Sequence, residues 1–102
     1  MRNRVQIEVP KEKIEGFCKK QHIRRLLFFG SVIRKDFGPN SDVDALVEFE
    51  PGQTVGFIRL AGMEIELSKI LKRKVDLRTP AELSRYFRQE VLDSAEVQYA
   101  EG

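Results

Sequence analysis

The stretch that decides the fold is residues 24–44, RRLLFFGSVIRKDFGPNSDVD. Its first part, residues 24–29, is short and apolar and is stopped by a glycine, so a buried strand is predicted, although periodicity alone does not exclude a helix. Residues 31–37 predict a short helix that the serine at its start can cap, and residues 38–40, Gly-Pro-Asn, then force a turn. A strand, a Gly-Ser turn and a helix are therefore expected in direct succession.

The remaining sequence predicts two more strands and three more helices. Residues 42–49 alternate between apolar and polar side chains, and residues 74–78 do so over a shorter length, as strands do. Helices are predicted over residues 10–21, over residues 55–71, and from residue 79 to about residue 92. The order α-β-α-β-α-β-α predicts an α/β (α+β) fold, in which a small mixed β-sheet has helices packed against it.

Apolar faces are predicted for the last two helices. In the helix over residues 55–71, a broad buried face is expected from Phe57, Ile58, Leu60, Ala61, Ile65 and Leu71. The final helix begins with Thr79, Pro80 and Glu82, which match an N-cap, a first-turn proline and the acid of a capping box. Its apolar stripe continues through Leu83, Phe87, Val91 and Leu92. Phe87 is expected in the core, whereas Tyr86 and Tyr99 suit either the core or a partner surface.

Composition indicates one globular domain over residues 1–102. With 41% hydrophobic and 33% charged residues, the chain is neither disordered nor fibrous, and its formal charge of +2 is too small to indicate nucleic-acid binding. The single cysteine, Cys18, and the single histidine, His22, cannot form a Cys/His zinc site, so a core thiol and a surface imidazole are expected. The absence of a signal-like stretch and of a long apolar run predicts a cytoplasmic protein with no membrane partner.

Two acids at the start of the second predicted strand are candidate metal ligands. Asp42 and Asp44 are two residues apart, so their carboxylates project from one face of the strand about 6 to 7 Å apart. Taken alone, the pair is more typical of a solvent-exposed strand face than of a metal site, because such faces often carry acids for solubility. Gly30-Ser31 changes that balance, because a strand-to-helix turn with free N–H groups suits phosphate, and magnesium held by the two acids would supply the counter-charge. An ordinary turn with a serine cap is the alternative for Gly30-Ser31.

Asp76 is the third candidate acid. Val75 and Leu77 point away from it on the predicted third strand, as an acid aimed at the same site requires. Three convergent carboxylates repel one another unless a cation lies between them, and Asp76 could then help to deprotonate an attacking hydroxyl. The alternative is a surface salt bridge of Asp76 with Arg73, Lys74 or Arg78. Glu48 lies farther along the strand and is left outside the predicted site.

The motifs Gly30-Ser31-Val32-Ile33-Arg34 and Ser41-Asp42-Val43-Asp44 resemble the signature of the polymerase-beta nucleotidyltransferase superfamily, and in particular its small MNT-type domains. The resemblance continues through Lys74-Val75-Asp76-Leu77 and the Thr79-Pro80 helix start, and so covers most of the chain. Lys35 departs from the usual pattern, which has glycine after the arginine. The resemblance implies a polymerase-beta-like nucleotidyltransferase fold.

The same resemblance implies roles for individual residues. Gly30, Ser31, Arg34 and Ser41 would bind the nucleotide, while Asp42, Asp44 and Asp76 would be the catalytic carboxylates and the ligands of Mg²⁺. The implied reaction is attack by a hydroxyl on the α-phosphorus of a nucleoside triphosphate, here ATP, with release of pyrophosphate.

The resemblance also implies a partner. Small MNT domains are commonly paired with a HEPN-domain ribonuclease toxin, and some transfer AMP to a tyrosine of that toxin. Because the sequence stops soon after the last predicted helix, the acceptor is expected on another polypeptide, in a hetero-oligomer with this MntA-like antitoxin. The main alternative is a non-catalytic antitoxin that neutralises by binding. A nucleic-acid module using Lys19-Lys20, Arg24-Arg25 and Lys72-Arg73-Lys74 is disfavoured, since such clusters are more often solvated faces.

Overall fold

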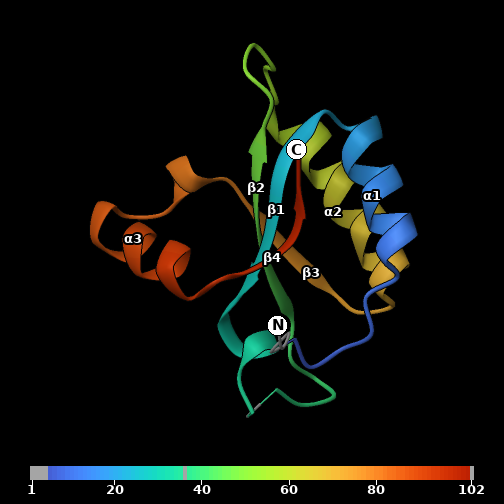
Figure 1. The fold of residues 1–102 in the computed structure, drawn as a ribbon, viewed down its shortest axis with the longest axis vertical. Helices are drawn as coiled ribbons and strands as arrows, with labels where there is room; N and C mark the ends of the chain where they lie inside the picture. The colour runs from blue at the N-terminus through green and yellow to red at the C-terminus, as the bar shows by residue number, and fades with distance from the viewer. Residues whose placement is uncertain (1–4, 36, 102) are drawn as a thin grey trace.

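The computed structural model, shown in Figure 1, describes residues 5–35 and 37–101. The α-helices within these ranges are α1 (Lys11–Lys20), α2 (Phe57–Leu71) and α3 (Arg85–Ser94), and two 3-10 helices, η1 (Gly30–Ile33) and η2 (Pro80–Glu82), accompany them. The strands are β1 (Ile23–Phe29), β2 (Val43–Phe49), β3 (Val75–Arg78) and β4 (Glu96–Ala100). None of the helices in the described ranges has the length and apolar character that crossing a membrane requires.

The four strands form one mixed sheet in the order β3-β2-β1-β4. β1 is antiparallel to both β2 and β4, whereas β2 and β3 are parallel. A parallel pair cannot be joined by a tight hairpin, and α2 supplies the long crossover that this pair needs. The prediction of a small mixed sheet with helices packed against it is confirmed.

Helices cover both faces of the sheet (Figure 1). α1 and α2 pack on one face over the larger core, which includes Phe17, Phe28, Val47 and Leu67. α3 lies on the other face over a smaller core of Leu27, Phe29, Leu46, Leu83 and Val91. Successive side chains of a strand point to opposite faces, so β1 and β2 contribute to both cores.

The predicted helix over residues 31–37 is wrong. The chain makes only the 3-10 turn η1 there, and Arg34 is already extended, with φ −117° and ψ 158°. The Val32 carbonyl accepts a hydrogen bond from the Gln6 N–H at 2.8 Å, so the N-terminal segment takes an acceptor that a continuing helix would use. Ser31 is likewise not a helix cap, because Phe29 occupies that position and no side chain caps the turn.

The final helix begins later than predicted. Thr79 and Glu82 do form the predicted capping box, with Pro80 in the first turn. This capping box begins the short 3-10 helix η2 and not the α-helix. Leu83 is then extended and buried in the smaller core, which ends the turn. α3 starts anew at Arg85, and the Ser84 hydroxyl caps it by accepting from the Phe87 N–H at 3.2 Å.

The fourth strand was not predicted. β4 pairs with β1 at the edge of the sheet, with Leu26 opposite Tyr99 and Leu27 opposite Val97. Val97 is 52% exposed, and Tyr99 packs only partly against the core. The side-chain pattern of residues 96–100 therefore gives little sign of a strand, because β4 is held in the sheet by its backbone pairing with β1.

Two predictions about buried aromatic and aliphatic side chains are wrong. On α2 the predicted Leu71 is buried and Leu60 partly buried, but Phe57, Ile58 and Ile65 are exposed. Met63 and Leu67, which were not in the predicted face, are buried in their place. On α3, Phe87 is 48% exposed. Helical spacing identifies a set of possible faces, and the angle at which each helix crosses the sheet decides which one is buried.

The predictions for the cysteine and the histidine are confirmed. Cys18 is fully buried in the larger core, and this burial raises the pKa of its thiol to about 12. His22 is exposed in the turn before β1, with φ +58°.

Candidate active site

Two of the predicted acids are neighbours in the sheet. Asp44 on β2 stands opposite Phe29 of β1 on one side and opposite Asp76 of β3 on the other. The residues flanking these acids, such as Val43 and Leu77, are buried against α1 and α2. Asp44 and Asp76 therefore project from the face that α3 covers, as the alternation in their strands predicted.

Gly30 brings the turn after β1 directly against Asp44. Its φ is +74°, in the left-handed region that favours glycine, and a Cβ atom at this position would overlap Oδ2 of Asp44. No other residue type combines this backbone angle with such a close approach. The Gly-Ser turn and the Asp44 carboxylate, 14 residues apart in sequence, are thus packed as one unit.

The surroundings of Asp44 disfavour its charge. Partial burial raises the pKa of the Asp44 carboxyl, and repulsion from Asp76 and, more weakly, Asp42 raises it further. Arg78 and Arg34 act on this pKa in the opposite direction. A bound cation would relieve the repulsion among the acids.

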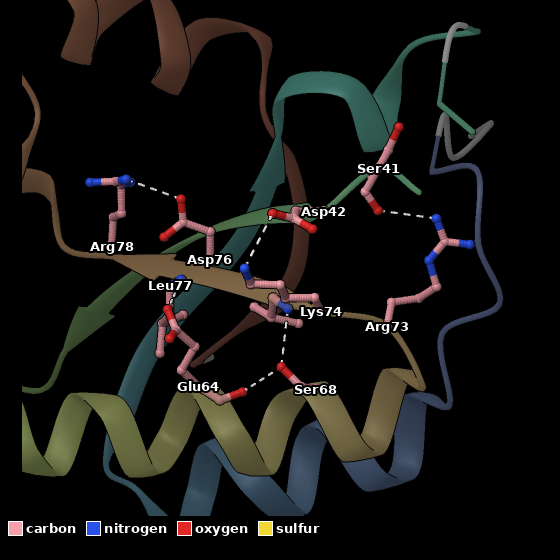
Figure 2. Close-up of polar contacts among 10 residues, drawn as sticks. Ser41, Asp42, Glu64, Ser68, Arg73, Lys74, Asp76, Leu77 and Arg78 are labelled. Carbon is pink, nitrogen blue, oxygen red and sulfur yellow. Dashed lines mark hydrogen bonds and ion pairs between the residues drawn. The ribbon is translucent and has the colours of Figure 1, made fainter. Parts of the chain in front are cut away.

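Asp42 and Asp76 have cationic partners (Figure 2). An Arg78 guanidinium nitrogen lies 3.0 Å from Oδ2 of Asp76, and Nζ of Lys74 lies 4.0 Å from Oδ2 of Asp42. The salt bridge that the sequence offered as an alternative for Asp76 is therefore present, with Arg78. Both acids remain partly open to solvent, so exchange of these partners needs only side-chain rotation.

The donor set is chemically suited to Mg²⁺. Carboxylate oxygens are the hard ligands that magnesium prefers, and Asp44 carries an electrostatic cost that a cation would remove. Across the described residues, no three carboxylate, imidazole or thiol groups are arranged to hold a metal ion. Asp42 and Asp76 would have to turn from Lys74 and Arg78 toward Asp44 to complete such a site.

The loop before Asp42 is held by Arg73. Its guanidinium donates to the carbonyl oxygens of Gly38 at 2.6 Å and Ser41 at 3.1 Å, and it lies 4.5 Å above the ring of Phe37. The Ser41 hydroxyl accepts from the Gly38 N–H at 3.1 Å, so it closes this turn. These contacts set the position from which Asp42 projects.

Side chains of α2 hold the outer edge of β3. The Leu77 N–H donates to Oε2 of Glu64 at 2.8 Å, and the Val75 N–H donates to the Ser68 hydroxyl at 3.0 Å (Figure 2). These hydrogen bonds fix the backbone on both sides of Asp76. Sequence reasoning missed Glu64 and Ser68, and their polar character within an otherwise apolar helix face was the available signal.

Two residues of the basic clusters form ion pairs within the chain. Lys20 pairs with Glu66 at 2.6 Å, and Arg25 makes two bonds to Glu48 at 2.7 and 2.9 Å. Glu48 is thus engaged elsewhere on the sheet, which agrees with its exclusion from the predicted site.

A cavity of about 370 Å³ adjoins the acids on the α3 side. Asp44, Asp76 and Arg78 form its polar wall, and Leu83 and Phe87 contribute apolar surface. Its remaining lining residues are Phe29, Glu82 and Ser84. The sequence pointed to the acids but not to Arg78 as part of a cavity or to Phe87 as part of its wall.

Comparison with known proteins places this arrangement in a family. A family model described as a nucleotidyltransferase domain matches residues 11–97. MJ0435 of Methanocaldococcus jannaschii, named as a candidate protein adenylyltransferase, is 31% identical over 85 residues, which are 83% of this chain and 89% of that protein.

Solved structures share the fold. One described as a candidate minimal nucleotidyltransferase has a TM-score of 0.70 and 31% identity, covering 84% of this chain and 86% of its own. A toxin–antitoxin structure with AMP-PNP has a TM-score of 0.74 at 21% identity, covering 91% and 75%. A structure of the tri-AMPylated HEPN toxin of Shewanella oneidensis with its MNT antitoxin has a TM-score of 0.63 at 19% identity, covering 89% and 70%. On the family match and the 31% identical relative, this chain belongs to the nucleotidyltransferase domain family.

Proposed function

We propose that this chain transfers AMP from ATP to a tyrosine hydroxyl of a HEPN-domain ribonuclease toxin, and so acts as its antitoxin in the cytoplasm. Membership of the nucleotidyltransferase family makes the chain an enzyme of the nucleotide-transferring class. The observation that carries the proposal is the placement of Asp44 beside Asp76 and against Gly30. In this proposal the acids hold the metal ion and the neighbouring Gly30-Ser31 turn holds the phosphates.

Similar proteins support the choice of nucleotide and partner. MJ0435 is named as a candidate protein adenylyltransferase, and the toxin–antitoxin structure with AMP-PNP contains an ATP analogue. The Shewanella oneidensis structure contains a HEPN toxin that carries AMP groups. A hetero-oligomer of this chain with a HEPN toxin is the corresponding assembly.

The residues of the site have distinct roles in this proposal. Gly30 allows its backbone to approach the nucleotide phosphates, Ser31 donates from its hydroxyl, and Arg34 adds positive charge. Asp42, Asp44 and Asp76 would hold Mg²⁺. When bound, Mg²⁺ neutralises phosphate charge and helps to orient the reacting phosphorus. The Ser41 hydroxyl, which closes the turn before Asp42, supports the nucleotide site through that turn.

Asp76 is the proposed proton acceptor. The tyrosine oxygen forms a bond to the α-phosphorus as its proton passes to the Asp76 carboxylate. The bond from the α-phosphorus to the bridging oxygen breaks, and its electron pair leaves with pyrophosphate. In the structure the Asp76 carboxylate forms an ion pair with Arg78 at 3.0 Å, and it would have to turn from this partner to take the proton.

Two observations favour a second function, neutralisation by binding without transfer. Asp42 and Asp76 are paired with Lys74 and Arg78, and Lys35 replaces the glycine usual in this motif. An antitoxin that acts by binding alone would need the surface that contacts the toxin, and it would not need Asp42, Asp44 and Asp76.

The test is intact-mass spectrometry of the co-purified toxin after incubation with Mg²⁺ and ATP. The wild-type chain is expected to add one or more AMP units to the toxin, and the Asp42→Asn/Asp44→Asn double variant is expected to add none. Replacing the modified tyrosine by phenylalanine should abolish the gain in mass. An unchanged toxin mass in a stable, neutralised complex would contradict transfer and support the binding antitoxin.

A further inference from the structure

The cavity beside the acids has one wall that the reaction described so far does not use. Asp44, Asp76 and Arg78 stand on one side, while Leu83 and the 48% exposed Phe87 present apolar surface on the α3 side. We propose that this cavity receives the aromatic ring of the acceptor and that Phe87 contacts that ring. This inference rests on the proposed function, and it names the part of the site that selects an aromatic hydroxyl.

The position of the cavity suits the acceptor better than it suits the triphosphate of the nucleotide. In-line displacement at phosphorus places the attacking oxygen opposite the leaving group. Gly30 and Ser31 follow β1 and are not among the residues that line the cavity, so phosphates held at that turn would leave the cavity free for the acceptor. An attacking hydroxyl would then arrive past Asp76, the proposed proton acceptor, through the cavity.

The chemistry of the lining suits a phenol. A tyrosine side chain has an apolar ring and one polar tip, and it needs both kinds of surface when it is enclosed. Phe87 and Leu83 can contact the ring, while the hydroxyl reaches the carboxylate of Asp76. A serine or threonine hydroxyl would reach the same acid without covering the apolar wall.

The apolar wall is fixed by its own hydrogen bonds. Ser84 caps the first turn of α3 by accepting from the Phe87 N–H. Arg88 donates to the carbonyl oxygens of Pro80 at 2.8 Å and Leu83 at 3.1 Å, which ties α3 to η2. Phe87 is therefore held at the cavity while half of its side chain remains open to an incoming ring.

The first test is steady-state kinetics of AMP transfer to the partner toxin by Phe87→Ala. Its KM for the toxin is expected to rise about tenfold, as loss of a ring contact implies, with the KM for ATP unchanged. Tyr86→Ala is the matched control, because Tyr86 neighbours Phe87 on α3, is 88% exposed and does not line the cavity. An unchanged KM for the toxin would overturn the inference, as would a rise confined to the KM for ATP, which would mean that Phe87 contacts the base.

A second test is independent of transfer. Isotope-labelled wild-type chain is titrated with N-acetyltyrosinamide, and the backbone NMR signals of residues 82–88 are followed. Saturable shifts there, absent with N-acetylserinamide and lost in Phe87→Ala, are expected even if the proposed transfer activity fails. Equal responses to the tyrosine and serine compounds would overturn the inference and leave the proposed function standing.

Discussion

At the scale of single residues, the site depends on one glycine and one aspartate that touch. Gly30 adopts a backbone angle that other residues avoid, and it leaves no room for a side chain beside Asp44. Asp44 in turn lies where burial and two neighbouring acids oppose its charge. Both features cost stability, and both lie where the proposed function puts the phosphates and the cation.

Gly30→Ala is expected to destabilise the protein and weaken nucleotide binding. The left-handed backbone alone costs a residue with a Cβ atom about 1 to 2 kcal/mol, and the new methyl group must also displace Asp44. Chemical denaturation and ATP titration measure the two effects. The control is Gly62→Ala on the exposed side of α2, where a Cβ meets nothing within 4 Å and a gain of about 0.5 to 1 kcal/mol is expected. Equal stability changes in the two variants would contradict this account.

Asp44→Asn is expected to stabilise the metal-free protein at neutral pH. Because the pKa of Asp44 is higher in the folded than in the unfolded state, the folded state binds more protons in the interval between the two values. The contribution of Asp44 to the free energy of unfolding therefore falls as pH rises through that interval. The Asp44→Asn substitution removes this loss of stability. Thermal unfolding of wild type and variant between pH 3 and 8, without divalent cations, measures the difference.

The matched control for this prediction is Asp93→Asn on α3, outside the cavity lining. Added Mg²⁺ should raise the melting temperature of the wild type and of Asp93→Asn more than that of Asp44→Asn. If Asp44→Asn melts below the wild type at pH 7 without metal, the electrostatic cost assigned to Asp44 is wrong.

At the scale of elements, the position of Asp76 is set by α2. β3 is four residues long and lies at the edge of the sheet, where strands leave N–H groups unpaired. Glu64 and Ser68 accept the outward N–H groups of Leu77 and Val75, so the helix completes the strand's hydrogen bonding. The crossover helix thereby holds an acid of the site as well as joining two strands.

Glu64→Met is expected to lower the free energy of unfolding by about 1 to 3 kcal/mol, because the Leu77 N–H loses a charged acceptor. AMP transfer should fall as well, since Asp76 is adjacent to the released backbone. Glu64→Gln keeps an acceptor oxygen and should retain most of both properties. Urea denaturation and intact-mass transfer assays compare the variants, and a Gln variant as impaired as the Met variant would assign the effect to charge and not to the hydrogen bond.

At the scale of the whole molecule, the sheet is completed by β4 from the end of the described chain. β4 covers the outer edge of β1, whose side chains belong to both hydrophobic cores. Without it, the apolar strand β1 would become an exposed edge. The last strand is thus part of the folding unit although its own sequence is only weakly apolar.

Removal of residues 96–102 is expected to abolish most of the stability of the domain, which for a typical domain is about 5 to 15 kcal/mol. Circular dichroism and size-exclusion chromatography should report loss of cooperative unfolding and aggregation. Val97→Thr is the control, because the Val97 side chain is half exposed and threonine also favours strands. A monomeric truncated protein with a wild-type melting temperature would contradict the role given to β4.

The sequence by itself determined the central features of this protein. The strand over residues 24–29, the alternation over residues 42–49 and the short strand carrying Asp76 follow from local sequence pattern. That pattern also placed Asp44 and Asp76 on one face and indicated Gly30 as a close-approach position. The family resemblance rested on those same residues.

Only the tertiary structure decided the rest, because the forces concerned act between elements. The helix expected after Ser31 is cut short by a bond from Gln6, β4 exists through pairing with β1, and the buried face of α2 depends on how the helix meets the sheet. The partners of the acids, Lys74 and Arg78, were visible as neighbours in sequence, but their pairing required coordinates. Phe87 was assigned to the core by its spacing, and three-dimensional packing left it at the cavity instead, since Leu83 and Val91 already fill the smaller core.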